Sequence, residues 1–161
     1  MSLEQQKLFI ETLPYKPYCT DDLDSGLRIR PAKSALTKRL IQHNKLFLVS
    51  WIVLDLDSPF FWYLMDSRVL PPPNLVSFNP ENYHCHIYYS LKAPVCRSNM
   101  ARYKPLRYLA AIEYALCKKW GADHGYSGLI SKNPIHKHWN TKQFREESWD
   151  LGELADWLPE L

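Results

Sequence analysis

The hydrophobic pattern along the chain predicts a mixture of helices and strands. Apolar residues at helical spacing predict a helix over residues 2–13, ended by Pro14, and another over 105–120, ended by Gly121. A nearly continuous apolar run over 46–54 indicates a strand that is buried on both faces and therefore central in a sheet. We expect further helices over 31–43, 60–65 and 151–158, and further strands over 75–78 and 83–91.

Composition narrows the class of protein. The 161 residues suit one compact domain, and a hydrophobic content of 46% excludes a disordered chain. No apolar run approaches the ~20 residues that a membrane-spanning helix needs, and the charges of Glu4, Lys7 and Glu11 argue against a signal peptide. The four cysteines have irregular spacing without a CxxC pair, which argues against a disulfide framework or a zinc ribbon and favours a cytoplasmic location.

The net charge of +3 conceals an uneven distribution. Residues 92–145 contain 11 Lys and Arg against two acids, Glu113 and Asp123, whereas residues 146–161 contain six acids and no base. A basic segment of this kind is typical of a surface that binds a phosphate-bearing partner, although an ordinary solvated face has the same composition. We therefore expect the basic segment to face a phosphate-bearing partner.

Two carboxylates at the end of the apolar run are the strongest chemical signal. Asp55 and Asp57 are two residues apart, so in a strand both side chains point to the same face. Mutual repulsion and desolvation make this pair costly beside apolar residues unless a cation or a base neutralises it. Mg²⁺ is a hard ion that prefers such oxygen ligands. The pair therefore predicts a metal site, and the alternative is a turn with exposed acids.

A second polar face follows in the next part of the chain. Asn82, His84 and His86 lie at alternate positions, so in a strand they share one face. Imidazoles at such positions bind a metal, contact a phosphate or form hydrogen bonds within the core. Two histidines on one face, in a sheet that also presents two acids, favour a functional site.

Further candidate residues lie later in the chain. Asp123 follows the helix predicted over 105–120, where it supplies a third carboxylate to the sheet or merely caps a turn. Glu113 falls on the apolar stripe of that helix, so we interpret it as structural and as the alternative third carboxylate. Lys132 and Asn133 belong to a rigid, basic loop before a proline, which suits a phosphate, a base or an ordinary turn.

These motifs, in this order, resemble the replicase family of plasmid Rep proteins, the primases of ColE-type theta-replicating plasmids. That family is a branch of the archaeo-eukaryotic primase (primase-polymerase) superfamily. The resemblance runs from Tyr18 nearly to the end of the chain, and its specificity comes from the ordered set of motifs. They are Asp55-x-Asp57, Asn82-x-His84-x-His86, Gly121-Ala122-Asp123, Tyr126-x-Gly128 and Lys132-Asn133-Pro134-x-His136-x-x-Trp139.

The resemblance implies an α+β fold, with an RRM-like antiparallel sheet, flanking helices and a small N-terminal helical part. It implies one catalytic domain over 1–161, in which the N-terminal part covers about 1–44 and the catalytic sheet and helices cover 45–161. Family members commonly continue into a helical region that binds the replication origin. We expect this chain to lack that region.

The resemblance also implies a DNA-dependent primase, a nucleotidyltransferase that makes a primer. Asp55, Asp57 and Asp123 would be its catalytic residues and would hold two Mg²⁺ or Mn²⁺ ions. The motif histidine and its neighbours are the expected nucleotide contacts: His86, His84, Lys132 and Asn133. Expected partners are nucleoside triphosphates, a single-stranded DNA template or plasmid origin DNA, and a host DNA polymerase as a candidate, but no membrane.

Two other functions stay open from the sequence. His84-Cys85-His86 fits the HxH metal motif of rolling-circle Rep endonucleases, which cut single-stranded DNA through a tyrosine. Tyr114 with Lys118 is the candidate for that tyrosine, but its spacing is one residue longer than YxxK. A non-catalytic single-stranded nucleic-acid-binding module would instead stack bases on Trp and Tyr side chains. Neither alternative gives a role to the acidic pair.

Overall fold

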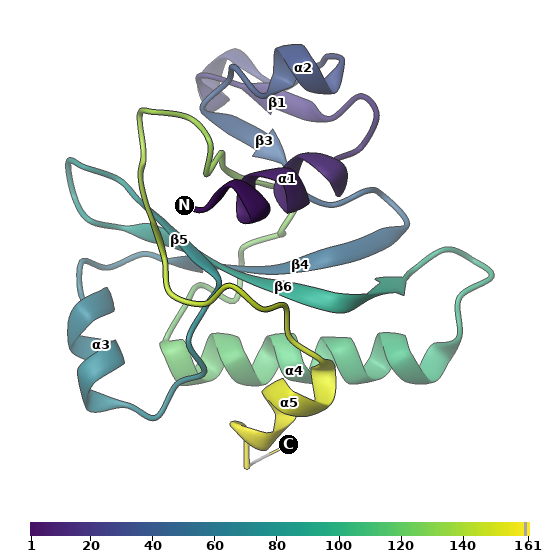
Figure 1. The fold of residues 1–161 in the computed structure, drawn as a ribbon, viewed down its shortest axis with the longest axis vertical. Coiled ribbons are helices and arrows are strands. Elements are labelled where there is room, and N and C mark those ends of the chain that lie inside the picture. The colour runs from purple at the N-terminus through teal and green to yellow at the C-terminus, as the bar shows by residue number, and fades with distance from the viewer. Residues whose placement is uncertain (160) are drawn as a thin grey trace.

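A computed structural model describes residues 1–159 and 161, and it has the predicted α+β class (Figure 1). The helices are α1 (Leu3–Glu11), the 3₁₀ helix η1 (Leu23–Ser25), α2 (Ala32–Ala35), α3 (Phe61–Ser67), α4 (Tyr103–Trp120) and α5 (Leu151–Asp156). The strands are β1 (Tyr18–Thr20), β2 (Arg28–Ile29), β3 (Leu40–Gln42), β4 (Leu48–Leu56), β5 (Leu75–Phe78), β6 (Cys85–Cys96), β7 (Ile130–Lys132) and β8 (Asn140–Gln143). None of the described helices has the length and apolar character that a membrane crossing requires.

The main sheet is antiparallel, with the strand order β4-β6-β5-β8. Helix α4 runs along one face of this sheet, and α1 lies on the other side (Figure 1). In the β4–β6 register Asp55 is directly opposite His86, so the two side chains leave the sheet on the same face. The antiparallel sheet with flanking helices that the resemblance implied is confirmed.

The two faces of the main sheet bury separate hydrophobic clusters. Ile52 of β4 belongs to the cluster on the α4 side, which also contains Trp120. The next residue toward the N-terminus, Trp51, belongs to the opposite cluster, where its ring lies 6.2 Å from Tyr88 and 5.9 Å from Phe9 of α1. Alternate residues of β4 are therefore buried on opposite faces, as the apolar run predicts.

The prediction that this apolar strand is central in its sheet was wrong. Within the main sheet β4 pairs with β6 alone, and β6 is the strand with a partner on each side. The run is apolar because layers cover both faces of β4, and face burial gives no information about which strand edges are paired. One edge of β4 is therefore available for contacts with other segments.

The prediction of a helix over 31–43 was wrong beyond its first turn, which is the only part that is helical. Helix α2 ends at Ala35, and β3 then pairs with β1 and β7 in a second antiparallel sheet of order β2-β1-β3-β7. The carbonyls of Leu36 and Lys38 accept hydrogen bonds from the side-chain amide of Asn133, both at 2.9 Å. These partners lie far along the chain, so no local pattern reveals them. The N-terminal part consequently contains strands as well as helices, and β7 connects it to the later chain.

The other predicted elements are present with shifted bounds. Tyr83 has a φ of 61°, so the strand predicted over 83–91 begins instead at Cys85, and it continues to Cys96. The strand over 75–78 is confirmed, as are the helices over 2–13, 60–65, 105–120 and 151–158.

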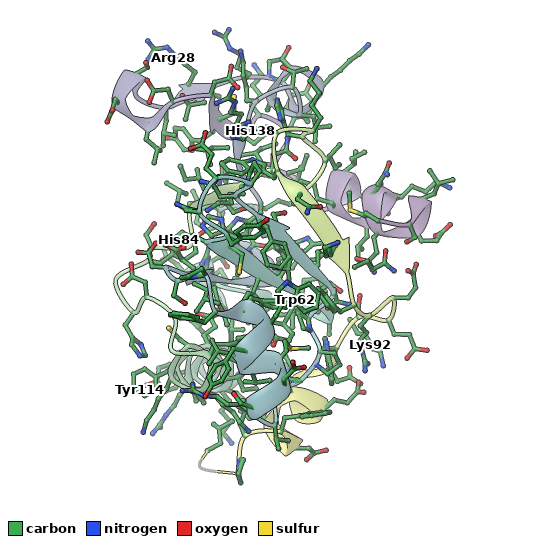
Figure 2. The ribbon with its side chains drawn as sticks, turned by 90° about the vertical axis from the view of Figure 1, so that its left-hand side faces the viewer. Arg28, Trp62, His84, Lys92, Tyr114 and His138 are labelled. Atoms are coloured by element: carbon green, nitrogen blue, oxygen red, sulfur yellow. The ribbon has the colours of Figure 1, made fainter. Side chains whose placement is uncertain are left out.

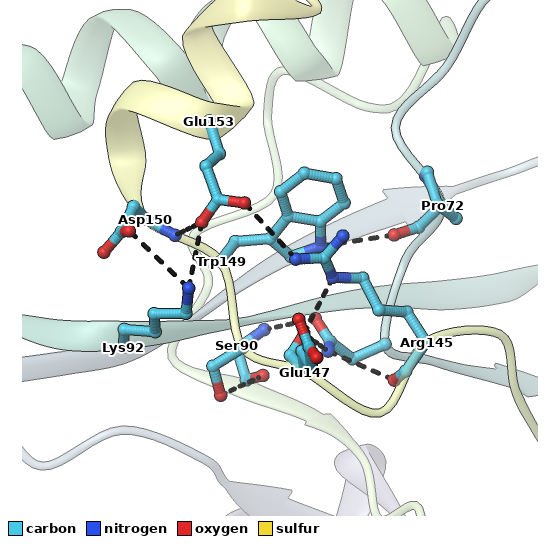
Figure 3. Close-up of polar contacts among 10 residues, drawn as sticks. Pro72, Ser90, Lys92, Arg145, Glu147, Trp149, Asp150 and Glu153 are labelled. Carbon is cyan, nitrogen blue, oxygen red and sulfur yellow. Dashed lines mark hydrogen bonds and ion pairs between the residues drawn. The ribbon is translucent and has the colours of Figure 1, made fainter.

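Ion pairs connect the acidic C-terminal segment to the basic one (Figure 3). Lys92 Nζ lies 3.2 Å from one carboxylate oxygen of Glu153, and Arg145 lies 3.5 Å from the other. The Arg145 guanidinium also stacks 3.6 Å from the centre of the Trp149 ring. Part of the charge contrast between the two segments is therefore neutralised within the protein.

Two glycines that differ in backbone conformation test how α4 ends. Gly121 has a φ of 70° at the C-terminus of α4, whereas Gly152 lies inside α5 with free space around the position of a Cβ atom. We expect Gly121→Ala to lower the free energy of unfolding by about 1–2 kcal/mol, because alanine is strained in the left-handed region. Gly152→Ala, the control, should raise it by about 0.5–1 kcal/mol. Chemical denaturation measures both, and equal effects would contradict the assignment of the helix end.

Candidate active site

Three carboxylates from two distant segments meet at the edge of β4. Asp55 lies near the end of β4, Asp57 directly follows the strand, and Asp123 follows α4. Each offers an oxygen atom, and the three oxygens all lie within 4.8 Å of one another. The side chain of Asp55 is 19% exposed and that of Asp57 is 66% exposed. The cluster is thus anchored in the fold on one side and open to solvent on the other.

Main-chain contacts place Asp123 beside the pair. The backbone N–H of Asp123 donates to the carbonyl of Asp55 at 2.8 Å, on the edge of β4 that β6 does not occupy. Gly121 turns the chain at the end of α4, and the Asp123 carboxylate accepts a hydrogen bond from the N–H of Gly125 at 2.8 Å. The structure therefore brings together the three acids that the sequence analysis selected.

Two histidines contact this acidic cluster. His86 Nε2 lies 3.4 Å from Asp55 Oδ1, and His84 Nδ1 lies 3.3 Å from Asp57 Oδ1. His86 is buried, whereas about a third of the His84 side chain is exposed, and Figure 2 shows His84 at the edge of the molecule, above Tyr114. Each histidine therefore faces a different aspartate of the pair.

The second sheet orients the buried histidine. The backbone N–H of Lys132, at the end of β7, donates to His86 Nδ1 at 2.9 Å. Because Nδ1 accepts this bond, the neutral ring carries its proton on Nε2, the nitrogen that faces Asp55 at 3.4 Å. The carbonyl of Lys132 in turn accepts a hydrogen bond from the hydroxyl of Tyr88, which lies two residues from His86 in β6. Lys132 thus connects the N-terminal sheet to the acidic cluster through its main chain.

Burial and charge have opposite effects on the ionisable groups of the site. Burial opposes the ionisation of Asp55, but the polar contact with His86, together with the charges of Lys132 and His84, holds the pKa of that carboxyl below its ordinary value. Burial lowers the pKa of His86, although Asp55 partly compensates. Burial also lowers the pKa of Lys132, and the charge of Asp55 works against this shift. The arrangement favours a carboxylate facing a neutral imidazole.

Tyr126 is a member of the site that the sequence analysis did not select as a functional residue. Its ring stacks on that of His86, with centroids 5.2 Å apart and an interplanar angle of 27°, and its hydroxyl donates to the carbonyl of Ile130. The Tyr126-x-Gly128 motif was the one signal that could have indicated it. The contact covers one face of the imidazole and restricts its orientation.

Two asparagines lie apart from the cluster. The Asn82 side chain accepts a hydrogen bond from the N–H of His84 at 3.0 Å, so it shapes the turn before β6 and does not share a strand face with His86. Asn133 is completely buried, its amide donates to the carbonyls that follow α2, and its oxygen accepts from the N–H of Ile135 at 3.1 Å. The expectation that Asn133 contacts a nucleotide stays untested, and the structure gives this side chain a clamping role.

Glu113 and Lys132 border the cluster. Glu113 and Asp123 line the same hollow of about 250 Å³, and burial raises the pKa of Glu113. The group of three acids that could hold a metal contains Asp123 and not Glu113, among the described residues. The Lys132 ammonium lies 5.3 Å from the centre of the Trp139 ring.

A model of the Replicase family matches residues 12–158 of the chain. The chain belongs to the Replicase family. The resemblance found in the sequence is therefore confirmed over nearly its full extent.

The fold of this Replicase-family chain is also that of a primase-polymerase. It is similar to the AEP domain of the cyanophage S-2L primase-polymerase (PrimPol), with a TM-score of 0.66 and 14% sequence identity. The similarity covers 98% of this chain and 96% of the other. No curated protein matches the chain. At this identity the structural similarity establishes the fold alone.

A third histidine of this Replicase-family chain, His43, makes stability depend on pH. It is buried between Ser131 of the second sheet and Tyr88 of the main sheet. Its Nδ1 lies 3.0 Å from Ser131 Oγ, and its ring centre lies 6.4 Å from that of Tyr88. Burial, with repulsion from His86 and Arg97, lowers the pKa of His43 from 6.5 to about 3. Between about pH 6.5 and pH 3, His43 is protonated in the unfolded chain and neutral in the folded chain. Lowering the pH in this range therefore favours unfolding.

We expect the free energy of unfolding to fall by about 1.4 kcal/mol per pH unit through His43 as the pH decreases from about 6.5. In His43→Gln the free energy of unfolding should depend less steeply on pH, by about 1.4 kcal/mol per pH unit, which corresponds to one proton. The remaining pH dependence comes from groups such as His86 and Asp55. Urea denaturation across this pH range measures the difference. Above neutral pH the two slopes should coincide, and identical slopes in acid would contradict the prediction.

Proposed function

We propose that this chain is the catalytic part of a plasmid replication initiator, a metal-dependent primase that joins nucleotides on a DNA template. One observation carries the proposal: three carboxylate oxygens from two segments lie within 4.8 Å of one another, with a histidine against each member of the Asp55–Asp57 pair. Membership of the Replicase family and the primase-polymerase fold support the same function.

The three acids fit Mg²⁺ or Mn²⁺. Hard divalent cations take oxygen ligands and keep positions for water and substrate phosphates, and the open side of the cluster leaves room for these. Clustered carboxylates repel one another, so a cation relieves a strain that the main chain otherwise sustains. Bound divalent ions supply Lewis acidity that activates the attacking hydroxyl and stabilises charge on the phosphates. We propose Asp55, Asp57 and Asp123 as the ligands.

The groups around the acids would bind and orient the nucleotide. The Nε2 of His86 faces Asp55 from the buried side of the cluster, and this contact restricts the position of the carboxylate. His84 is partly exposed beside Asp57, where an imidazole can meet a phosphate. The positive charge of the Lys132 ammonium lowers the pKa of Asp55, and a cation near the cluster would also attract the negative charge of a triphosphate. We propose His84 and Lys132 as direct nucleotide contacts, and His86, whose ring nitrogens face Asp55 and the main chain of Lys132, as the residue that positions Asp55 beside the nucleotide.

The alternative functions have less support. An HxH endonuclease needs histidine metal ligands, yet the group that could hold a metal in the described part of the chain contains three aspartates and no histidine. A non-catalytic binder would gain nothing from three carboxylates that repel a phosphate backbone. Both alternatives therefore leave the central feature of the site without a role.

Asp57→Asn tests the metal site, because it removes a charge and preserves size. We expect template-dependent primer synthesis to fall by about 100-fold or more, since the metal contribution is several kcal/mol. The side chain is largely exposed and the clustered carboxylates repel one another, so the metal-free chain should unfold at the same temperature or slightly higher. Labelled nucleotides, a single-stranded template and Mn²⁺ provide the assay.

Asp66→Asn is the matched control, since Asp66 is an exposed acid on α3 outside the cluster. It should retain normal synthesis. Near-normal primer synthesis by Asp57→Asn, or a covalent DNA adduct in place of a labelled oligonucleotide, would overturn the proposed function.

Lys132→Ala tests nucleotide binding. Loss of a cation that contacts a triphosphate should raise the nucleotide KM about tenfold or more and change kcat less. The main-chain hydrogen bond from Lys132 to His86 does not need the side chain, so the acidic cluster should persist. Lys142→Ala, at an exposed position of β8, is the control. An unchanged KM for Lys132→Ala would show that this lysine has only a structural role.

A further inference from the structure

A groove surrounds the C-terminal end of α4 and continues from the acidic cluster. The hollow that contains Asp123 is also lined by Tyr114, and Tyr114 lines a second hollow of about 360 Å³. That second hollow shares Arg68 with a third, of about 470 Å³, which opens beside α3. Neighbouring hollows share a wall residue, so they lie next to one another around the end of α4, and together we call them the α3–α4 groove.

The α3–α4 groove presents aromatic side chains that the hydrophobic core does not use. Phe60 and Tyr63 line its far end and are 59% and 69% exposed, and Tyr114, at its middle, is 63% exposed. Helix α3 is held in place by its buried residues Phe61 and Leu64, so its exposed aromatic residues are not needed for packing. Figure 2 shows Tyr114 on the same side of the molecule as His84. Exposed rings in this arrangement suit stacking on unpaired bases.

Cations with fixed positions lie between the aromatic residues. The Arg68 guanidinium donates to the carbonyl of Lys119 at 2.6 Å, and the Lys119 ammonium donates to the carbonyl of Trp157 at 2.7 Å. Each of these carbonyl partners carries no formal charge, and an arginine with one bond made still has further N–H donors. Lys118 lines the same hollow. Fixed cations between exposed rings match the alternation of phosphates and bases in a single strand.

We propose that the α3–α4 groove binds single-stranded nucleic acid, with bases stacked on Tyr63 and Phe60 and phosphates at Arg68 and Lys119. Asp123 of the acidic cluster lines the hollow at one end of the groove, and Leu56 and Ser58, which flank Asp57 in the sequence, line the hollow at the other end. A strand in this position would pass beside the metal ligands. The assignment of that strand as template or primer rests on the proposed function, whereas the binding itself does not.

Tyr63→Ala tests the groove without disturbing the catalytic residues. Binding of a fluorescent oligothymidylate of about 12 nucleotides is measured by anisotropy with the full chain in chelator. We expect Tyr63→Ala to weaken binding about tenfold, and Tyr63→Phe, which keeps the ring, to change it less than about twofold. Tyr15→Ala removes an exposed tyrosine far from the groove and should bind like the unaltered chain.

A second measurement locates the strand. An oligonucleotide that contains 5-bromouracil, irradiated on the protein, should cross-link to the peptide around α3. Three results would each overturn the proposal. They are equal affinity of Tyr63→Ala and the unaltered chain, cross-links confined to other segments, and binding of duplex DNA as tight as that of the single strand.

The groove and the proposed function can fail separately. Normal primer synthesis together with unchanged oligonucleotide affinity in Tyr63→Ala contradicts the groove alone. If Tyr63→Ala binds the oligonucleotide more weakly but the unaltered chain makes no primer, the groove is supported and the proposed function is contradicted.

Discussion

The site depends on a strand that is buried on both faces but paired along one edge only. Backbone polar groups in a covered strand must find hydrogen-bond partners, and β6 supplies them on one side of β4. On the other side, near the end of the strand, the carbonyl of Asp55 is satisfied by the N–H of Asp123. The same bond brings a third carboxylate to the first two. Backbone satisfaction thus assembles a cluster that side-chain electrostatics alone would disperse.

The acidic cluster is consequently stabilised from outside. Its members repel one another, but His86 fixes Asp55, and Lys132 fixes His86 through a main-chain bond from the second sheet. The stacking of Tyr126 on the imidazole removes the remaining freedom of that ring. The small N-terminal sheet is therefore part of the support of the site, because β7 belongs to it. A carboxylate held in this way would need little reorganisation to bind the cation that we propose.

Local patterns predicted the features that depend on local physics. The apolar run before Asp55 and the stripe of the helix that Gly121 ends both follow from periodicity, and they sufficed to select the acids. The same patterns failed for β3 and for the edge position of β4, because distant partners decide both. Asn133 illustrates the limit. Its sequence context suggested a ligand contact, whereas its hydrogen bonds to the carbonyls after α2 use its side chain to connect two segments nearly 100 residues apart.

Charge counted along the sequence also mixes two kinds of cation that the structure separates. Lys92 pairs with Asp150 and Glu153, and Arg145 pairs with Glu153, so their charges are largely cancelled within the protein. Arg68 and Lys119 are instead held by backbone carbonyls, which fix their positions and carry no formal charge. Arg68 lies outside the basic segment altogether. A cation contributes to an anion-binding surface according to what holds it in place, and that partner is set by the fold and not by the sequence around it.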